Sequence, residues 1–220
     1  MPNDSIIVDT KQLDILTMEL KGFEKQVGEA AYHALNRTID HVITQVGRIV
    51  PKEYAIKAGD VKETFKGGIK RPSKNDLTTY AVSKGYSLTL AHFPHSPQVP
   101  PASGKKYKVK ATIKRGDRRT INTEPKPFVA PTGAKSEDED KMQYNIFRRT
   151  GTFKIMKKGR YAGKLREAIM PVFTSSIPQM ITNEKVKKQI EKVSQEKLDE
   201  RLEHEIIYRM TSINKKIKKG

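Results

Sequence analysis

A run of basic side chains in the middle of the chain has the clearest potential for chemistry. Between residues 105 and 119 the chain contains one acidic residue, Asp117. The basic residues of this run are Lys105, Lys106, Lys108, Lys110, Lys114, Arg115, Arg118 and Arg119. Because a solvated surface usually mixes charges of both signs, we expect the run to contact DNA phosphates or an acidic protein lining. Simple solvation of a basic face stays open as the alternative interpretation.

A second basic cluster lies between Arg148 and Arg166, with eight basic residues and no acidic one. Neither cluster shows the aromatic pattern typical of proteins that stack the bases of single-stranded DNA or RNA. No recognition helix is apparent, so contact with DNA would involve the phosphates and would not depend on base sequence. The two clusters therefore favour unspecific binding of a polyanion.

The residues usually found in catalytic and metal sites are few and scattered. The chain has no Cys, which excludes disulfides and thiolate chemistry. The segment from Gly159 to Lys164 resembles a phosphate loop, but it is one residue short, and Leu165 stands where Ser or Thr would bind magnesium. We therefore expect no enzyme, no metal site and no cofactor. The histidines are His33, His41, His92, His95 and His204.

Positive charge is concentrated in the middle and C-terminal parts of the 220-residue chain. The formal net charge is +18, from 43 Lys and Arg against 25 Asp and Glu. Residues 1–51 carry a net charge of −2, residues 52–126 carry +11 and residues 127–220 carry +9. This asymmetry points to an acidic or polyanionic partner. We find no signal peptide and no apolar run long enough to span a bilayer, so we expect no membrane contact.

The first basic run has the period of a β-strand. Tyr107, Val109, Ala111 and Ile113 alternate with lysines and a threonine, which predicts a strand with one buried face and one lysine-rich, solvated face. Residues 115–117 then read as a turn, so we expect a hairpin. Further strands are expected at 88–92 and 144–149, in a β-rich basic region of about residues 78–150.

Two long helices are expected, one on each side of this region. The first is predicted over about residues 22–50, where apolar residues recur every three or four positions and Pro51 ends the pattern. The second is predicted from about Pro178, with a narrow apolar stripe on a charged helix. The stripe needs a partner, either the first helix or another subunit, and we assign it to a subunit interface. Its residues include Val186, Ile190, Val193, Leu198, Leu202 and Ile206.

These elements predict an α+β fold, with a long N-terminal helix and a long C-terminal helix packed against a small antiparallel sheet from the middle of the chain. We expect one α+β domain over residues 1–177. Residues 178–220 would form the long C-terminal helix.

Five short segments, in order and spacing, resemble one protein family over about residues 13–210. They are ALNRT at 34–38, YAIKAGDVK at 54–62, PFVA at 127–130, IFRR at 146–149 and SIP at 176–178. The family that they resemble is the minor tail protein Z family of tailed bacteriophages and prophages, which are lambda-type tail completion proteins. The acidic run at 137–140 and the extension before Leu13 depart from the simplest members of this family.

The resemblance implies a structural virion protein that completes the tail at its head-proximal end, in the neck around the DNA channel. It implies partners among the tail terminator and head-closure proteins, self-association in a ring and contact with packaged double-stranded DNA. Such a protein is made in the bacterial cytoplasm and resides in the virion. The alternative is a free basic protein that binds nucleic acid without sequence preference.

Overall fold

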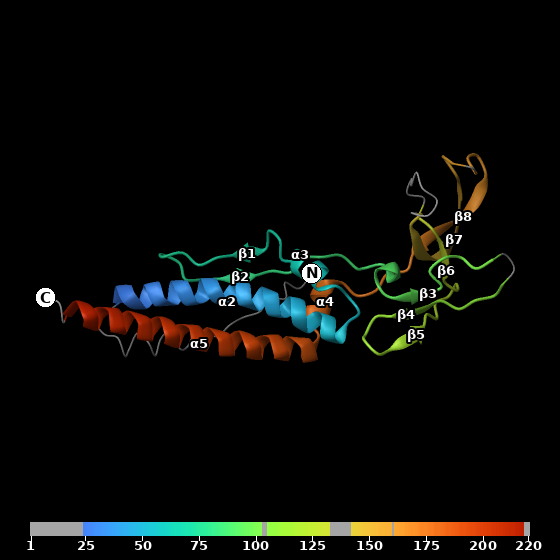
Figure 1. Ribbon diagram of the computed structural model, residues 1–220. Helices are drawn as coiled ribbons and strands as arrows, with labels where there is room; N and C mark the ends of the chain where they lie inside the picture. The colour runs from blue at the N-terminus through green and yellow to red at the C-terminus, as the bar shows by residue number, and fades with distance from the viewer. Residues whose placement is uncertain (1–23, 103–104, 133–141, 160, 218–220) are drawn as a thin grey trace. The chain divides into compact units, whose positions relative to one another are not determined.

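A computed structural model describes residues 24–102, 105–132, 142–159 and 161–217 (Figure 1). The acidic run at 137–140 and the extension before Leu13 lie outside these ranges. The fold is α+β, with a long helix near each end of the described chain and small antiparallel sheets between them, which confirms the predicted class.

The chain divides into two compact units. The helical unit comprises the described residues within Met1–Pro51, Lys57–Gly85 and Ile177–Gly220. The β unit comprises those within Lys52–Ile56 and Tyr86–Ser176. This division differs from the predicted one, because the C-terminal helix belongs to the same unit as the N-terminal helix and the β-rich region forms the other unit.

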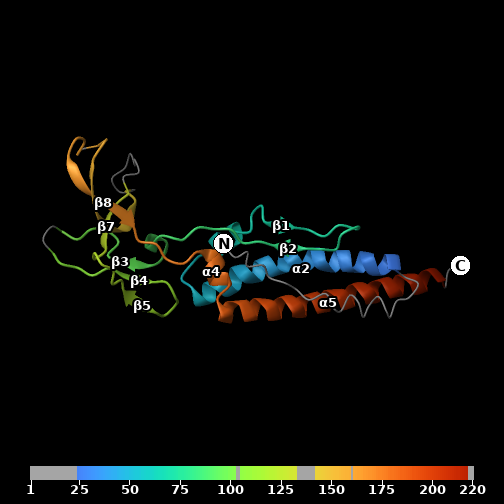
Figure 2. The ribbon, with the colours of Figure 1, turned by 180° about the vertical axis from the view of Figure 1, so that it is seen from behind.

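The helical unit is built on α2 (Glu24–Glu53) and α5 (Glu184–Ile217), which lie side by side in both views (Figures 1 and 2). The first helix was predicted to end at Pro51, and this end is wrong, because α2 includes Pro51 and continues to Glu53. Proline lacks an N–H donor, but its φ angle still fits a helical turn. The second predicted helix is divided into α4 (Ile177–Ile181) and α5, with Thr182 and Asn183 between them.

The apolar stripe of α5 is buried within the chain's own fold. Leu198 and Leu202 pack with Ala34 and Leu35 of α2, and Leu77 covers part of the same cluster. The short alanine side chains leave room for the leucines of the facing helix.

The assignment of this stripe to a subunit interface is therefore wrong for its central residues, and the open alternative, the first helix as partner, holds for Leu198 and Leu202. An apolar stripe looks the same in sequence whether a helix of the same chain or another subunit covers it. Val193 and Ile206 are half-buried. The fully buried members of the stripe are Val186, Ile190, Leu198 and Leu202.

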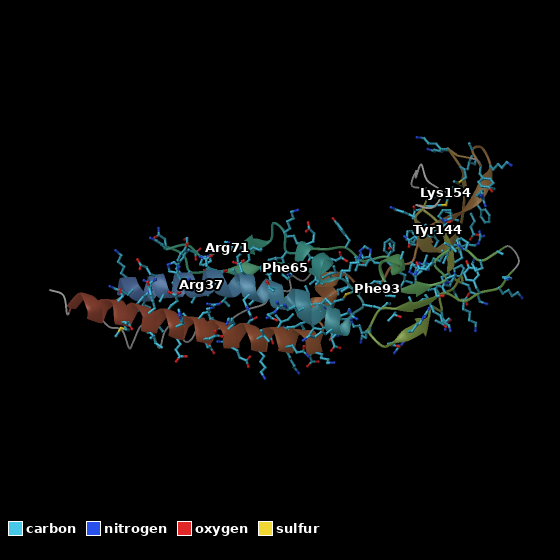
Figure 3. The ribbon with its side chains drawn as sticks, in the orientation of Figure 1. Arg37, Phe65, Arg71, Phe93, Tyr144 and Lys154 are labelled. Atoms are coloured by element: carbon cyan, nitrogen blue, oxygen red, sulfur yellow. The ribbon has the colours of Figure 1, made fainter. Side chains whose placement is uncertain are left out.

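Ion pairs set the direction and register of the two helices. Arg37 Nη1 of α2 lies 3.1 Å from Glu205 Oε1 of α5, and Arg209 Nη1 of α5 lies 2.6 Å from Glu29 Oε2 of α2 (Figure 3 labels Arg37). Residue numbers rise along one helix as they fall along the other, so the helices are antiparallel. Glu205 is 6% exposed, and a carboxylate so deeply buried needs its cationic partners.

A connecting segment lies along the helical unit. It contains α3 (Ala58–Glu63) and a two-stranded antiparallel sheet of β1 (Ile69–Lys70) and β2 (Tyr80–Ala81). Just after β1, the Arg71 guanidinium donates to both carboxylate oxygens of Asp40 on α2, at 3.0 and 2.7 Å. This bidentate pair fastens the segment to the first helix.

The β unit contains two three-stranded antiparallel sheets. One is ordered β3 (His95–Ser96), β4 (Lys110–Thr112), β5 (Arg118–Thr120). The other is ordered β6 (Phe128–Pro131), β7 (Tyr144–Ile155), β8 (Leu165–Pro171). Both contribute to one core cluster. Its buried residues are Leu90, Val109, Ala111, Val129, Ile146 and Val172.

One predicted strand is absent from the described residues. The segment 88–92 forms an isolated bridge at Thr89 with Phe173 and then the 3₁₀ turn η1 (Leu90–His92). The amides of His92 and Phe93 donate to the carbonyls of Thr89 and Leu90, at 3.0 and 3.1 Å. This tight turn buries Leu90 in the core, and the residues beside it no longer follow an extended strand. Alternation in the sequence does not distinguish such a turn from a strand.

We expect Leu198→Ala to lower the free energy of unfolding of the helical unit by about 2–5 kcal/mol, because it leaves a cavity in the buried seam between α2 and α5. Urea unfolding followed by far-ultraviolet circular dichroism measures this change. Ile207→Ala is the control on the same helix, since Ile207 is 59% exposed, and it should change stability by less than about 0.5 kcal/mol. Equal effects of the two substitutions would contradict the buried seam.

Candidate functional site

The part of the first basic run from Lys110 to Arg119 lies on the hairpin of β4 and β5, and a hairpin was predicted here. The strands pair antiparallel, with Ala111 opposite Arg119. Gly116 has a φ of +78° in the connecting turn, a conformation that favours glycine, and the amide of Asp117 donates to the carbonyl of Lys114 at 3.2 Å. Turn chemistry therefore accounts for the residues between the strands.

The backbone of this turn is hydrogen-bonded to residues 53–55. The Arg115 amide donates to the Glu53 carbonyl at 2.9 Å, and the Ala55 amide donates to the Ile113 carbonyl at 2.8 Å. Lys114 forms a β-bridge with Tyr54, whose side chain is buried. These bonds hold the turn against residues 53–55, so its basic side chains project from a fixed backbone.

All eight predicted basic residues are exposed, but they do not form one face. Lys110 pairs with Thr120, and Thr112 pairs with Arg118, so the side chains of Lys110 and Arg118 share the solvated face. Arg119 lies opposite the buried Ala111 and therefore belongs to the other face. The structure thus brings Lys110 and Arg118 together and separates Arg119 from them.

Arg119 also has an acidic partner. Its Nε donates to Asp117 Oδ1 at 2.7 Å. This hydrogen bond raises the pKa of the Arg119 guanidinium above its ordinary value. Arg119 is therefore already engaged with the acidic residue of the run.

The three lysines that precede β4 lie outside regular strand structure. β4 begins at Lys110, three residues later than the alternation from Tyr107 predicts. Val109 is buried and Lys108 is exposed as the alternation predicts, but Tyr107, predicted on the buried face, is exposed. The hydroxyl of Tyr107 accepts a hydrogen bond from the Val129 amide at 3.1 Å, which ties this segment to β6.

The second basic cluster lies on a longer hairpin formed by β7 and β8. Pairing is regular as far as Arg149 opposite Ile169 and resumes at Phe153 opposite Glu167. Between these pairs β7 bulges, with Gly151 at a φ of +72°. Glu167 holds the bulge, since its carboxylate accepts from Arg149 Nη1 and from the Gly151 amide, both at 3.0 Å.

We call the described part of residues 150–168 the arm. Phe153, Ile155 and Leu165 lie on one face of it and are 61%, 65% and 66% exposed. Lys154 and Arg166 are paired with each other and lie on the opposite face. Figure 3 shows Lys154 on this outer part of β7, beyond Tyr144 at the inner end of the strand. The arm therefore presents an apolar face and a basic face, and both are open to solvent.

The sequence interpretation located the charges of the arm but missed its aromatic residues. The sequence shows no aromatic pattern typical of base stacking, and the structure adds that Phe153 and Tyr161 of this cluster are exposed. The Arg166 guanidinium carbon lies 3.9 Å from the centre of the Tyr161 ring, a cation–π contact. The alternation of Phe153 and Ile155 with Lys154 could have revealed a strand with an apolar face.

The histidines do not converge on a common centre. His41 on α2 lies within 3.3 Å of Gln45 Nε2, whereas His95 Nδ1 contacts the Phe93 carbonyl at 2.8 Å in the β unit. Within the part of the chain that the structure describes, no three His, Cys, Asp or Glu residues are grouped so as to hold a metal ion. The absence of catalysis and of metal or cofactor binding stays a prediction.

Comparison with known proteins finds no matching family model, no matching curated protein and no matching solved structure. Among the described helices, none is long and apolar enough to cross a membrane. The case for a function therefore rests on the residues and on the two basic hairpins.

The environment of His41 predicts an acid-sensitive helical unit. Burial lowers its pKa below the ordinary value, and the nearby charges of Lys197, Arg201 and Arg48 lower it further, against an opposing effect of Glu200. A histidine whose pKa is lower in the folded state binds fewer protons there than in the unfolded chain. It therefore costs stability as the pH falls through and below about 6.5.

We expect the urea midpoint of the helical unit to fall less steeply in His41→Gln than in the wild type when the pH is lowered from about 7.5 to 5.5. Far-ultraviolet circular dichroism across a pH series measures the two slopes. Glutamine keeps a hydrogen-bonding side chain at this position but does not titrate. Identical slopes for the two proteins would show that His41 does not contribute.

Proposed function

We propose that this chain is a structural subunit of a bacteriophage virion that completes the tail at its head-proximal end and forms part of the neck around the DNA channel. The observation that carries this proposal is the solvated face of the β4–β5 hairpin, where Lys110 and Arg118 are neighbours. The acidic residue of the run, Asp117, is bound by Arg119. A surface of one sign suits a channel that holds a polyanion.

The segments that resemble the tail protein family support the proposal through their place in the fold. Ala34, Leu35 and Thr38, from the ALNRT segment, are buried in the helical unit. The segments at 127–130 and 146–149 overlap the paired strands β6 and β7. These segments therefore belong to the packed part of the fold, and the proposed likeness concerns architecture more than a chemical site.

Binding in such a channel would come from many weak contacts. Each subunit offers a few lysines and arginines that neutralise phosphates without reading bases. Copies arranged in a ring present these contacts at once, so a feeble interaction of one subunit becomes useful in the assembly. The same hairpin can instead face the acidic lining of a neighbouring ring.

Ring formation must use surfaces other than the buried part of the α5 stripe. Ile190, Leu198 and Leu202 are already covered by the chain itself. The proposed partners are further copies of this chain, the tail terminator and head-closure proteins, and packaged double-stranded DNA. The proposed location is the virion, after synthesis in the bacterial cytoplasm.

A free basic protein that binds nucleic acid without sequence preference is the second candidate. The exposed Phe153 and Tyr161 beside basic side chains favour it, because aromatic rings can stack with unpaired bases. The two candidates differ in the active species. A free binding protein must bind tightly in solution, whereas a ring subunit binds usefully only when assembled.

We expect mass spectrometry of purified virions to detect the chain at a fixed, low copy number, because a protein that completes the tail occupies one level of it. Non-structural proteins of the same infected cells serve as the control for contamination. If the chain is absent from virions and the soluble protein binds duplex DNA tightly, the neck proposal is wrong and the second candidate is favoured.

We expect replacement of Lys106, Lys108, Lys110 and Lys114 by Gln to leave folding intact and to reduce DNA retention by finished particles. The soluble wild-type protein should bind duplex DNA weakly, with a log–log salt slope of about 0.9 for each phosphate neutralised. The quadruple variant should lower that slope, as measured by fluorescence anisotropy at several salt concentrations.

The matched control removes the same charge from exposed positions of α5, where lysines alternate with glutamates, and it should retain wild-type particle behaviour. Full DNA retention by particles of the hairpin variant would show that the β4–β5 face is merely solvated. The control substitutions, each to Gln, are at Lys185, Lys187, Lys188 and Lys192.

A further inference from the structure

The outer half of β7 has an open edge. On one side, β6 pairs with β7 from Tyr144 to Phe147. On the other side, β8 pairs with β7 as far as Ile155. Among the residues that the structure describes, no strand lies beside Phe153–Ile155 on the β6 side. Within the described residues, the backbone of this segment is therefore unpaired on that side.

The backbone groups at this edge belong to Phe153 and Ile155. The Met156 amide donates to the Lys164 carbonyl at 3.0 Å, so Met156 turns its N–H toward the β8 side of the hairpin. Successive residues of a strand direct their N–H and C=O groups to opposite sides. Lys154 therefore faces β8 as Met156 does, whereas Phe153 and Ile155 direct their backbone donors and acceptors outward.

The side chains at the edge repeat the two-faced character of the arm. Phe153 and Ile155 lie on the apolar face with Leu165, while Lys154 lies on the basic face with Arg166. The single carboxylate on the apolar face, that of Glu167, is engaged by Arg149 and by the Gly151 amide. A two-stranded ribbon with an uncovered apolar face is marginally stable in water and gains from a third strand.

The charge of the arm and its two faces indicate which kind of molecule would bind at the edge of β7. A second copy of this chain carries the same net charge of +18, so its approach is opposed by repulsion. Duplex DNA would engage Lys154 and Arg166 but would leave the apolar face in water. A partner strand with alternating apolar and acidic side chains satisfies the backbone edge, the apolar face and the basic face together.

We propose that the outer edge of β7 binds an extended strand of a partner protein in which apolar and acidic side chains alternate. The added strand takes hydrogen bonds from the amides of Phe153 and Ile155 and donates its own to their carbonyls. Its apolar side chains extend the face of Phe153 and Ile155, and its carboxylates lie beside Lys154. This proposal holds whether or not the chain is a tail protein.

The first test uses a fluorescent peptide of alternating valine and glutamate, as long as the outer half of β7, with the intact protein. We expect saturable binding by anisotropy, and no binding of the matched peptide of alternating valine and lysine. Failure of the valine–glutamate peptide to bind, or equal binding of both peptides, overturns the proposal.

Substitutions then test whether the peptide binds through the backbone edge of β7 and through the basic side chains of the arm. Ile155→Pro removes an outward N–H and should bind the peptide about two- to tenfold more weakly than Ile155→Ala, which keeps it. Lys154→Glu with Arg166→Glu should weaken binding at least about tenfold, because repulsion replaces attraction. The matched control, Lys108→Glu with Arg118→Glu in the other basic run, should bind like the wild type.

Hydrogen exchange of the wild-type protein tests the edge without any substitution. We expect the peptide to slow exchange of the Phe153 and Ile155 amides most, since these amides face water in the free protein. If these amides stay unprotected while the peptide is bound, it binds elsewhere and the proposal is wrong. If the arm variants lose binding to a short DNA duplex but keep the peptide, the arm is a DNA contact and the proposal is also wrong.

Discussion

The antiparallel pairing of α2 with α5 is the constraint on which the helical unit depends. Glu205 is buried where Arg37 and Arg209 can both reach it, and Arg209 also binds Glu29 across the helices. Sliding one helix by a turn would separate Glu205 from Arg37 and Arg209 from Glu29, while the pair of Arg209 with Glu205 within α5 would remain. The ion pairs thus specify the register, while the alanine and leucine seam supplies the stabilisation. The chain passes between the helical unit and the β unit four times, after residues 51, 56, 85 and 176.

The features of the fold that depend on residues close together in the sequence could be predicted from the sequence. The period of α2 and the turn at Gly116 follow from neighbouring residues, and both were predictable. The partner of the α5 stripe was not, because residues 34 and 198 are far apart in sequence and a stripe does not name what covers it. The bulge at Gly151 was likewise hidden, since it depends on Glu167 reaching back from the next strand. Long-range pairings of this kind decide which exposed residues form one face.

The two basic hairpins differ in what lies beneath them. At the β4–β5 hairpin the inward residues Val109 and Ala111 are buried in the core. The charged face is therefore the one that stays exposed. On the arm the apolar residues Phe153, Ile155 and Leu165 are not covered by any described part of the chain. Charge alone is the argument for the proposal that the first surface contacts a polyanion. The second requires a partner that also covers apolar area, and a protein strand does this better than a phosphate backbone.

The net charge also constrains any assembly of this protein. Copies of a chain with a charge of +18 repel one another, and the repulsion grows as they gather around a common axis. The basic residues 105–119 account for a large part of the excess and lie on a hairpin whose backbone is anchored to residues 53–55. A polyanion or an acidic protein at that surface removes the repulsion that opposes assembly. By linkage, whatever binds there better in the assembled state also stabilises the assembly. If the proposed ring forms, an acidic partner at this surface would stabilise it, and ring formation would then be coupled to the presence of that partner.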